Sequence, residues 1–249
     1  MTLLYQGDCN ELMNEIPDNS VDLIFTDLPY GQVSCEWDKK IDFPAMWEQF
    51  MRIKKLNAPI FFCCTTKFGA DIINSAPKKC PFRYDIVWVK SAPAGFLQAK
   101  KMPMRKHEML YVFYEKLPFY DLSSHQHKFL KPVSVVKEEG MRKDPHKTAY
   151  GDNIHFHQKG QKNGESIYDP PLPNSILEIK SQRGKHATQK PTELMKWVLK
   201  YYSKEGDVVL DPTMGSGSTG VACIEMERNF IGIEMDPEIF EVAKNRLEI

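Results

Sequence analysis

Short apolar runs alternate with amphipathic stretches over the first 115 residues and again after residue 190. The runs have the length of buried strands, whereas the amphipathic stretches repeat their apolar positions with the period of a helix. The predicted strands are residues 3–6, 21–27, 59–64, 83–90, 108–114, 208–211 and 230–234, and the predicted helices are residues 8–15, 43–56, 67–75, 191–203, 218–227 and 237–247. This alternation predicts an α/β fold with a mostly parallel sheet that helices cover on both faces.

The alternation is lost between about residues 115 and 184, where Pro, Gly, His and Lys dominate. A disordered linker is one interpretation. Six aromatic residues in this stretch favour an inserted, partly irregular functional region instead. We therefore expect a main domain of residues 1–115 and 185–249, interrupted by an insertion of residues 116–184.

Composition narrows the class of protein. With 249 residues, 42% hydrophobic and 27% charged, the chain has the profile of a globular domain and not of collagen, a coiled coil or a wholly disordered protein. It shows no signal-peptide pattern at its start and no apolar run near the roughly 18 residues of a membrane span. The six cysteines form no Cys-x-x-Cys pair. We expect a cytoplasmic protein with free thiols and no metal site.

The charges cancel overall, with 33 Lys and Arg against 33 Asp and Glu, but they are segregated. Residues 78–162 contain 17 Lys and Arg and 8 Asp and Glu, so this segment carries a net charge of +9 and the remainder −9. A solvated basic face is one interpretation, and a phosphate-binding surface is the favoured one. The candidate nucleic-acid contacts on this surface are Lys100, Lys101, Arg105 and Lys106.

A glycine-containing turn follows the predicted strand 208–211, in the segment VVLDPTMGSGSTG. Its glycines permit positive φ and close approach of the backbone to a ligand, and the next helix offers unpaired N–H groups. Glu234 comes 23 residues after Asp211, at the end of the next strand, where an acid can accept hydrogen bonds from ribose hydroxyls. A plain connector is the alternative, but the pattern favours a nucleoside site.

The charge of Asp211 indicates which nucleoside. Asp211 and Pro212 stand where a dinucleotide would place its pyrophosphate, and a carboxylate repels that group. A carboxylate suits a cationic ligand, so S-adenosylmethionine (SAM), with its ammonium and sulfonium groups, fits better than NAD. The chain has no Gly-x-x-x-x-Gly-Lys-Ser/Thr loop, which disfavours a P-loop NTPase.

A second motif, VDLIFTDLPYG at residues 21–31, ends another predicted strand at Asp27. Ligands of open α/β sheets lie beyond the carboxyl ends of the strands. Asp27 is therefore expected to project into a cleft, with Pro29 and Tyr30 beside it. An ordinary junction between a strand and a turn is the alternative.

The residues Asp27-Leu28-Pro29-Tyr30 resemble the Asp-Pro-Pro-Tyr motif of SAM-dependent amino DNA methyltransferases. Residues 211–217 resemble the family's SAM-binding loop, and the other matching segments are HATQKPTELM (186–195), RKHEMLYVFY (105–114) and Asp8 in QGDCNEL. The catalytic motif comes first and the SAM loop last, which is the order of the family's β class. The resemblance covers about residues 3–115 and 185–247. It implies a doubly wound, mostly parallel, seven-stranded Rossmann-like methyltransferase sheet with a target-recognition insertion at 116–184.

The resemblance also implies the reaction, which is transfer of a methyl group from SAM to adenine N6 in double-stranded DNA after base flipping. The implied catalytic residues are Asp27, Leu28, Pro29 and Tyr30. In the family's mechanism the Asp27 side chain and the Leu28 backbone carbonyl would accept hydrogen bonds from the target amino group. The implied cofactor-binding residues are Asp8, Asp27, Thr188, Lys190, Asp211, Thr213, Gly215, Ser216, Gly217, Ser218 and Glu234. The family usually has Pro where this chain has Leu28, so the turn is expected to be less rigid.

Other functions stay open at this point. The main alternative methyl acceptor is cytosine N4. Asp27 favours adenine, because the family usually has Asp rather than Ser at this position when adenine is the target. Cytosine ring-carbon methylation needs a Pro-Cys dipeptide, and this chain has only the reverse order, Cys80-Pro81. An RNA or protein-amide methyltransferase and a decayed DNA-binding module, suggested by Leu28, are weaker alternatives. A homodimer is possible, and the recognition sequence cannot be read.

Overall fold

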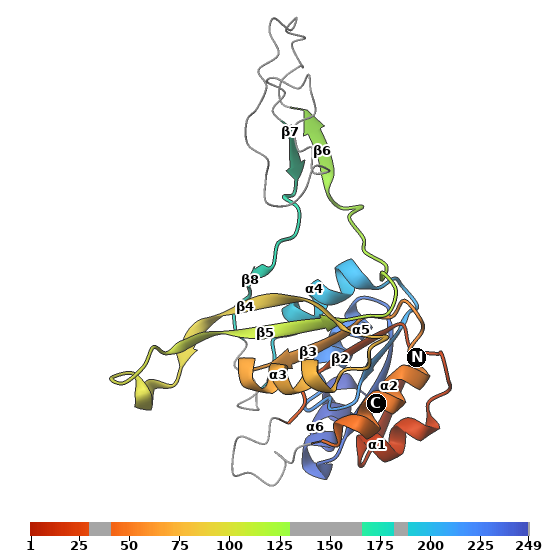
Figure 1. Cartoon of the computed structure of the whole chain (residues 1–249). Coiled ribbons are helices and arrows are strands. Elements are labelled where there is room, and N and C mark those ends of the chain that lie inside the picture. The colour runs from red at the N-terminus through yellow and green to blue at the C-terminus, as the bar shows by residue number, and fades with distance from the viewer. Residues whose placement is uncertain (30–40, 130–165, 182–188, 249) are drawn as a thin grey trace, which may run out of the picture. The chain divides into compact units, whose positions relative to one another are not determined.

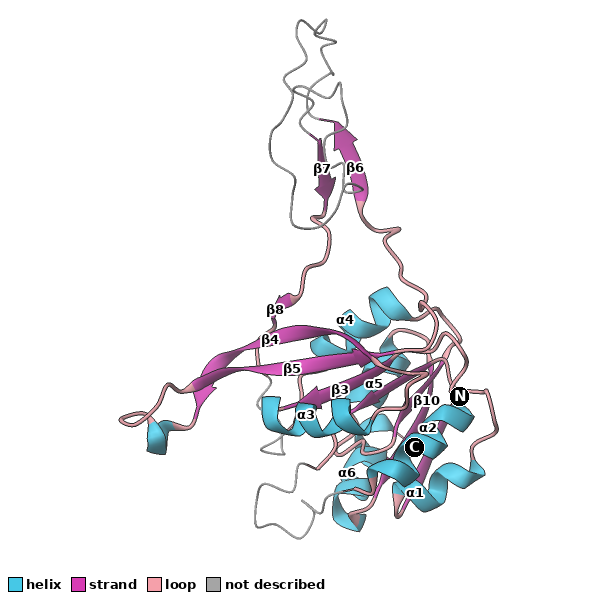
Figure 2. Cartoon of the chain, viewed as in Figure 1, coloured by secondary structure: helices cyan, strands magenta, loops and turns pink. Residues whose placement is uncertain are grey.

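The computed structural model describes residues 1–29, 41–129, 166–181 and 189–248. They belong to two compact units, one of residues 1–121 and 174–249 and one of residues 122–173. In chain order the elements are β1 (Thr2–Gln6), α1 (Cys9–Leu12), the 3₁₀ turn η1 (Met13–Glu15), β2 (Leu23–Thr26), α2 (Phe43–Ile53), β3 (Ile60–Cys64), α3 (Thr66–Ser75), β4 (Phe82–Ala94), the 3₁₀ turn η2 (Phe96–Gln98), β5 (Arg105–Phe113), β6 (Gln126–Phe129), β7 (Ser166–Asp169), β8 (Ile176–Glu178), α4 (Thr192–Tyr202), β9 (Val208–Asp211), α5 (Ser218–Glu225), β10 (Asn229–Glu234) and α6 (Pro237–Leu247) (Figures 1 and 2).

An eight-stranded sheet forms the centre of the larger unit, in the order β1-β10-β9-β2-β3-β5-β4-β8. Every neighbouring pair is parallel except the two pairs that contain β5. Seven strands therefore run in one direction and β5 alone runs against them, which confirms the predicted mostly parallel α/β sheet. The expected seven strands become eight because β8, in the stretch where the alternation is lost, pairs with β4.

Two neighbouring residues of β3 show how helices cover both faces of the sheet. Side chains alternate across a strand, and the ring of Phe62 lies 5.5 Å from that of Trp47 in α2. The ring of Phe61 points to the opposite face and lies 5.0 Å from that of Tyr202 in α4. All five residues of β3 are buried, which explains why the strand is a continuous apolar run. With both faces covered, the carboxyl edge of the strands is left to hold a site.

Local sequence signals set where the helices begin. Asp42 caps α2, because its carboxylate accepts a hydrogen bond from the Ala45 N–H at 3.3 Å. Gly217 precedes α5 with a φ of 79°, a left-handed conformation that favours glycine. Within α5, a Cβ on Gly220 would lie 2.7 Å from the Phe230 ring, so glycine is what lets this helix pack closely on β10. All six predicted helices are confirmed.

The smaller unit contains the antiparallel pair β6 and β7, in which His127 stands opposite Tyr168. His125 Nδ1 lies 2.8 Å from the Pro170 carbonyl oxygen, and Lys128 Nζ pairs with Asp169 at 2.5 Å. The unit's limits, 122 and 173, fall inside the predicted insertion of residues 116–184. Among the residues described, no helix is long and apolar enough to cross a membrane.

Candidate active site

Four acidic residues follow or end four neighbouring strands of the sheet. β1, β10, β9 and β2 are consecutive and parallel, so their carboxyl ends share one edge. Asp8 follows β1, Glu234 and Asp211 end β10 and β9, and Asp27 follows β2. The last three were predicted from the position of an acid at a strand end and Asp8 from the family resemblance, and the topology brings all four to one edge.

The loop after β9 is organised by the carboxylate of Asp211, which is only 4% exposed. One oxygen accepts a hydrogen bond from the Thr213 N–H at 3.2 Å and the other from the Thr219 hydroxyl at 2.6 Å. Burial raises the pKa of Asp211 to about 7, although these two hydrogen bonds lower it. Thr213 also bonds the hydroxyl of Thr26, at 3.0 Å, which ties the loop to the strand that leads to Asp27.

Glu234 holds Gly215 of the same loop. Its carboxylate accepts hydrogen bonds from the Gly215 N–H and the Asp236 N–H, both at 2.9 Å. Burial raises the pKa of Glu234, against the opposing effect of these hydrogen bonds. The Glu234 carbonyl accepts the N–H of Gly7 at 2.9 Å, which places the exposed Asp8 next to this strand end.

The Asp27 side chain is 28% exposed and forms an ion pair with Lys190, whose Nζ lies 2.5 Å from Asp27 Oδ2. The same Nζ lies 3.4 Å from Glu108 Oε2, and the other oxygen of Glu108 pairs with Lys90. Burial disfavours the ammonium of Lys190, but the carboxylates of Asp27 and Glu108 outweigh burial and raise the Lys190 pKa. Burial likewise raises the pKa of Glu108, and the two lysines reverse this and lower it overall. Asp27, Lys190, Glu108 and Lys90 thus form a chain of alternating charges, here called the charge chain.

Glu108 and Lys90 were not predicted as site residues, and Lys190 was expected to contact the cofactor. Glu108 stands near the start of β5, and β5 runs against the other strands. Its start therefore lies at the edge where the parallel strands end. The antiparallel direction of β5 is the signal that would have placed Glu108 in the site, and a single sequence does not give strand direction.

The Asp27-Leu28-Pro29-Tyr30 motif lies only partly within the described residues. Leu28 is 2% exposed and belongs to the core cluster that packs against α2. Its side chain is thus a core residue, whereas its predicted contribution to catalysis is its carbonyl group. Tyr30 and Thr188, also predicted as site residues, lie outside the described residues.

Arg246 of α6 is a further residue that the sequence did not indicate. Its Nη1 donates to the Ser218 hydroxyl at 3.0 Å and to the Ser216 carbonyl at 3.2 Å, and its Nη2 to the Thr192 hydroxyl at 3.3 Å. Ser216 and Ser218, predicted to bind cofactor, are buried. Arg246 thus joins the loop after β9 to the start of α4, close in sequence to Lys190.

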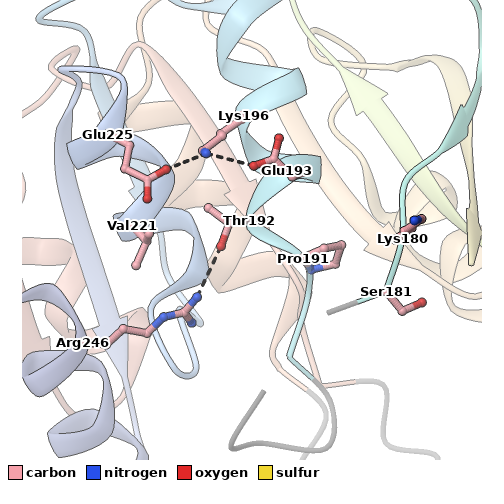
Figure 3. Close-up of a pocket in the computed structure, with 9 residues that line it drawn as sticks. All are labelled: Lys180, Ser181, Pro191, Thr192, Glu193, Lys196, Val221, Glu225 and Arg246. Carbon is pink, nitrogen blue, oxygen red and sulfur yellow. Dashed lines mark hydrogen bonds and ion pairs between the residues drawn. The ribbon is translucent and has the colours of Figure 1, made fainter. Parts of the chain in front are cut away.

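The pocket beside Arg246 is separate from the acidic edge. It has a volume of about 360 Å³ and is lined by Lys180, Ser181, Pro191, Thr192, Glu193, Lys196, Val221, Glu225 and Arg246. Lys196 bridges Glu193 and Glu225 at 2.9 and 2.6 Å across it (Figure 3). None of Asp8, Asp27, Asp211 and Glu234 lines this pocket.

Known proteins resemble this chain over most of its length. The model of the DNA methylase family for N6 and N4 methyltransferases matches residues 21–245. The Type II methyltransferase M.HinfI of Haemophilus influenzae is 28% identical over 99% of this chain and 68% of its own length. The DNA adenine methyltransferase YhdJ of Escherichia coli K12 is also 28% identical, over 99% of this chain and 82% of its own length.

A solved structure matches over the whole fold. The crystal structure of the M1.HpyAVI–SAM complex superposes with a TM-score of 0.63 at 26% identity, and the match covers 99% of this chain and 100% of that one. The family model covers far more than half of the sequence. The chain therefore belongs to the DNA methylase family, the SAM-dependent methyltransferases that act on amino groups of adenine or cytosine.

Proposed function

We propose that the protein transfers a methyl group from SAM to the N6 amino group of adenine in double-stranded DNA. The observation that carries this proposal is the position of Asp27. Its part-exposed carboxylate follows β2, and the Thr26–Thr213 hydrogen bond of 3.0 Å joins that strand end to the loop after β9. This loop, residues 212–217, is proposed to hold SAM and is here called the cofactor loop. A methyl donor held by this loop would thus lie beside the Asp27 carboxylate, which is proposed to accept a hydrogen bond from the target amine.

The residues at the acidic edge suit SAM. Asp8 and Glu234 offer carboxylate oxygens to ribose hydroxyls and to an adenine amine, and the acidic surroundings favour a cationic ligand. Asn10, two residues after Asp8, has a buried side-chain oxygen that accepts no hydrogen bond from the described residues, and a donor on the ligand would satisfy it. When bound, SAM supplies the methyl group from its sulfonium centre.

The remaining steps belong to the protein. The lone pair of an exocyclic amine is delocalised into the base ring, which makes it a poor nucleophile. If the Asp27 carboxylate and the Leu28 carbonyl accept hydrogen bonds from its two N–H groups, the nitrogen becomes more tetrahedral and its lone pair points toward the methyl group. This is catalysis by positioning and by preorganised electrostatics. As the N–methyl bond forms and the sulfur–methyl bond breaks, the amine nitrogen has one proton to release. Tyr30 is proposed to stack on the extruded base.

The thiol of Cys63 in β3 lies near Asp27 and is poorly suited to act as a nucleophile. Burial, followed by the charge of Asp27, raises its pKa well above the ordinary value. A neutral thiol is a weak nucleophile, so Cys63 does not support ring-carbon methylation of cytosine. The relative YhdJ is a DNA adenine methyltransferase, which supports adenine over cytosine N4 as the acceptor.

The test is methyl incorporation from labelled SAM into duplex DNA, followed by digestion and nucleoside analysis. N6-methyladenine is the expected product, and N4-methylcytosine as sole product would refute the choice of base. The Asp27→Ala variant should lose transfer and still bind SAM in calorimetry. The insertion at residues 116–184 is proposed to read the target sequence, and sequencing of the methylated DNA would identify that target.

A further inference from the structure

Among the described residues of the larger unit, the tip of the β4–β5 hairpin carries the most exposed large apolar side chain, that of Leu97. All residues from 91 to 107 are exposed. Phe96 and Leu97, side by side in the turn η2, are 81% and 95% exposed, and Met102 is 59% exposed. Such a group of large apolar side chains in water indicates a surface that contacts another molecule.

The tip has a defined backbone. Gly95 turns the chain with a φ of 91°, and the N–H groups of Gln98 and Ala99 donate to the carbonyls of Gly95 and Phe96, both at 3.0 Å. Further along, the Met102 N–H donates to the Gln98 carbonyl at 3.0 Å. Phe96 and Leu97 are therefore presented on a short helical turn, and the turn itself is held by β4 and β5.

The charge around these side chains has one sign. Lys100, Lys101, Arg105 and Lys106 lie within the exposed segment, and residues 91–107 contain no Asp or Glu. This combination of cations and apolar side chains complements the phosphates and bases of DNA. It disfavours pairing of two such tips, because they would repel each other.

The hairpin projects from the same edge of the sheet as the site. β4 runs parallel to β3, because each pairs antiparallel with β5, so its carboxyl end lies on the side of Asp27. Lys90 of β4 belongs to the charge chain, and Phe96 follows it by six residues. An extended chain of that length reaches up to about 20 Å beyond the site, which is far enough to enter a duplex lying over it. Figures 1 and 2 show the hairpin extending past the other strands of the sheet.

We propose that Phe96 and Leu97 form a wedge that enters the base stack beside the target base, while the neighbouring lysines hold phosphates. This inference rests on the proposed function, because a base that enters the site leaves a gap in the stack. Apolar side chains that insert between base steps separate them and stabilise the opened duplex. The wedge acts on extrusion of the base and takes no part in methyl transfer itself.

The experiment compares two duplexes that contain the mapped target sequence, one fully paired and one with an abasic position opposite the target base. Phe96→Ala/Leu97→Ala is the test variant. Leu117→Ala is the matched control, because Leu117 is 79% exposed and follows β5 at the opposite edge of the sheet. Methylation is measured as kcat/KM from labelled SAM.

The test variant should lose about fivefold or more on the paired duplex, since stacking on one base is worth at least about that factor. It should stay near wild type on the abasic duplex, and the control should match wild type on both. If kcat/KM of the test variant falls equally on both duplexes, or falls on neither, the wedge proposal is refuted. A smaller mass for the variant in light scattering also overturns it, by showing that the tip binds a second copy. Wild-type protein that methylates neither duplex refutes the proposed function instead.

Discussion

Replacing Glu108 by glutamine tests how Asp27 is released for the substrate. Lys190 Nζ lies 2.5 Å from Asp27 and 3.4 Å from Glu108. A target amine that bonds the Asp27 carboxylate has to compete with this ammonium. Glu108 offers Lys190 a second partner, so the ammonium can shift toward Glu108 and remain paired. In the Glu108→Gln variant the amide carries no charge, and Lys190 would stay on Asp27.

The size of the effect follows from the distances. Shortening the Nζ–Oε2 distance from 3.4 Å to about 2.8 Å gains about 1 kcal/mol at an effective dielectric constant of about 20. That energy is lost in Glu108→Gln, and a barrier higher by about 1 kcal/mol slows a reaction about fivefold. We expect kcat to fall about fivefold, with the Kd of SAM and the KM for DNA unchanged within twofold.

The assay is steady-state methylation with labelled SAM, together with SAM calorimetry and thermal unfolding. Asp22→Asn is the matched control, because Asp22 pairs with Lys55 at 2.7 Å just before β2, at the end away from Asp27. The control should lower stability and leave kcat near wild type. A Glu108→Gln variant whose kcat stays within twofold of wild type would refute the shift of Lys190, and so would a fall in kcat that tracks lost stability equally in both variants.

Three other predictions concern the cofactor loop and the core. Burial raises the pKa of Asp211 from 3.8 to about 7, so the folded protein binds this proton more tightly than the unfolded chain does. The stability that the bound proton contributes is present below about pH 4 and is lost as the pH rises to about 7. In SAM-free protein the cost of Asp211→Asn, measured by urea unfolding, should therefore be smaller at pH 8 than at pH 5 by about 1–4 kcal/mol, and an unchanged cost contradicts this. Burial also raises the pKa of Glu234, so the carboxylate proposed to accept hydrogen bonds from the ribose becomes protonated as the pH falls. SAM should bind less tightly at acidic pH in calorimetry, and Glu234→Gln should bind weakly with little of this pH dependence; a wild-type pH profile in the variant argues against the role. Leu28→Ala should cost about 2–5 kcal/mol of unfolding free energy, because the side chain is buried in the core. Its kcat well below the unfolding temperature should stay within a few-fold of wild type, and complete inactivity of folded Leu28→Ala would show that the side chain also positions the catalytic turn.

The regular elements and the acidic edge could be predicted, for a physical reason. In a parallel sheet every carboxyl end meets the same edge, so the acids at the ends of apolar runs identified Asp27, Asp211 and Glu234 before the strand order was known. This rule does not extend to β5, whose reversed direction brings Glu108 to that edge from the start of a strand. It also does not extend to Arg246, which reaches the cofactor loop from the far end of α6.

The short strand β8 was missed for a different reason. Its three residues, Ile176–Glu178, follow a stretch rich in proline and glycine, and Ile176 and Glu178 are exposed. Such a strand has too little buried surface to produce an apolar run. β8 is held in place by its pairing with β4, and a contact between segments so far apart in sequence cannot be read from the residues of β8 themselves.

The strand order also determines when the site can form during synthesis. β1 lies at the edge of the sheet and pairs with β10 alone, with Thr2 opposite Phe230. Translation at roughly 5–20 residues per second leaves β1 without that partner for about 10 to 45 seconds. Asp27 is without its ion-pair partner Lys190 for about 8 to 33 seconds at the same rate, because the two residues are 163 positions apart in sequence. A chain truncated before residue 190 contains Asp27, the proposed catalytic residue, but neither Lys190 nor the loop after β9. We therefore expect methylation activity only after residue 234 has been synthesised.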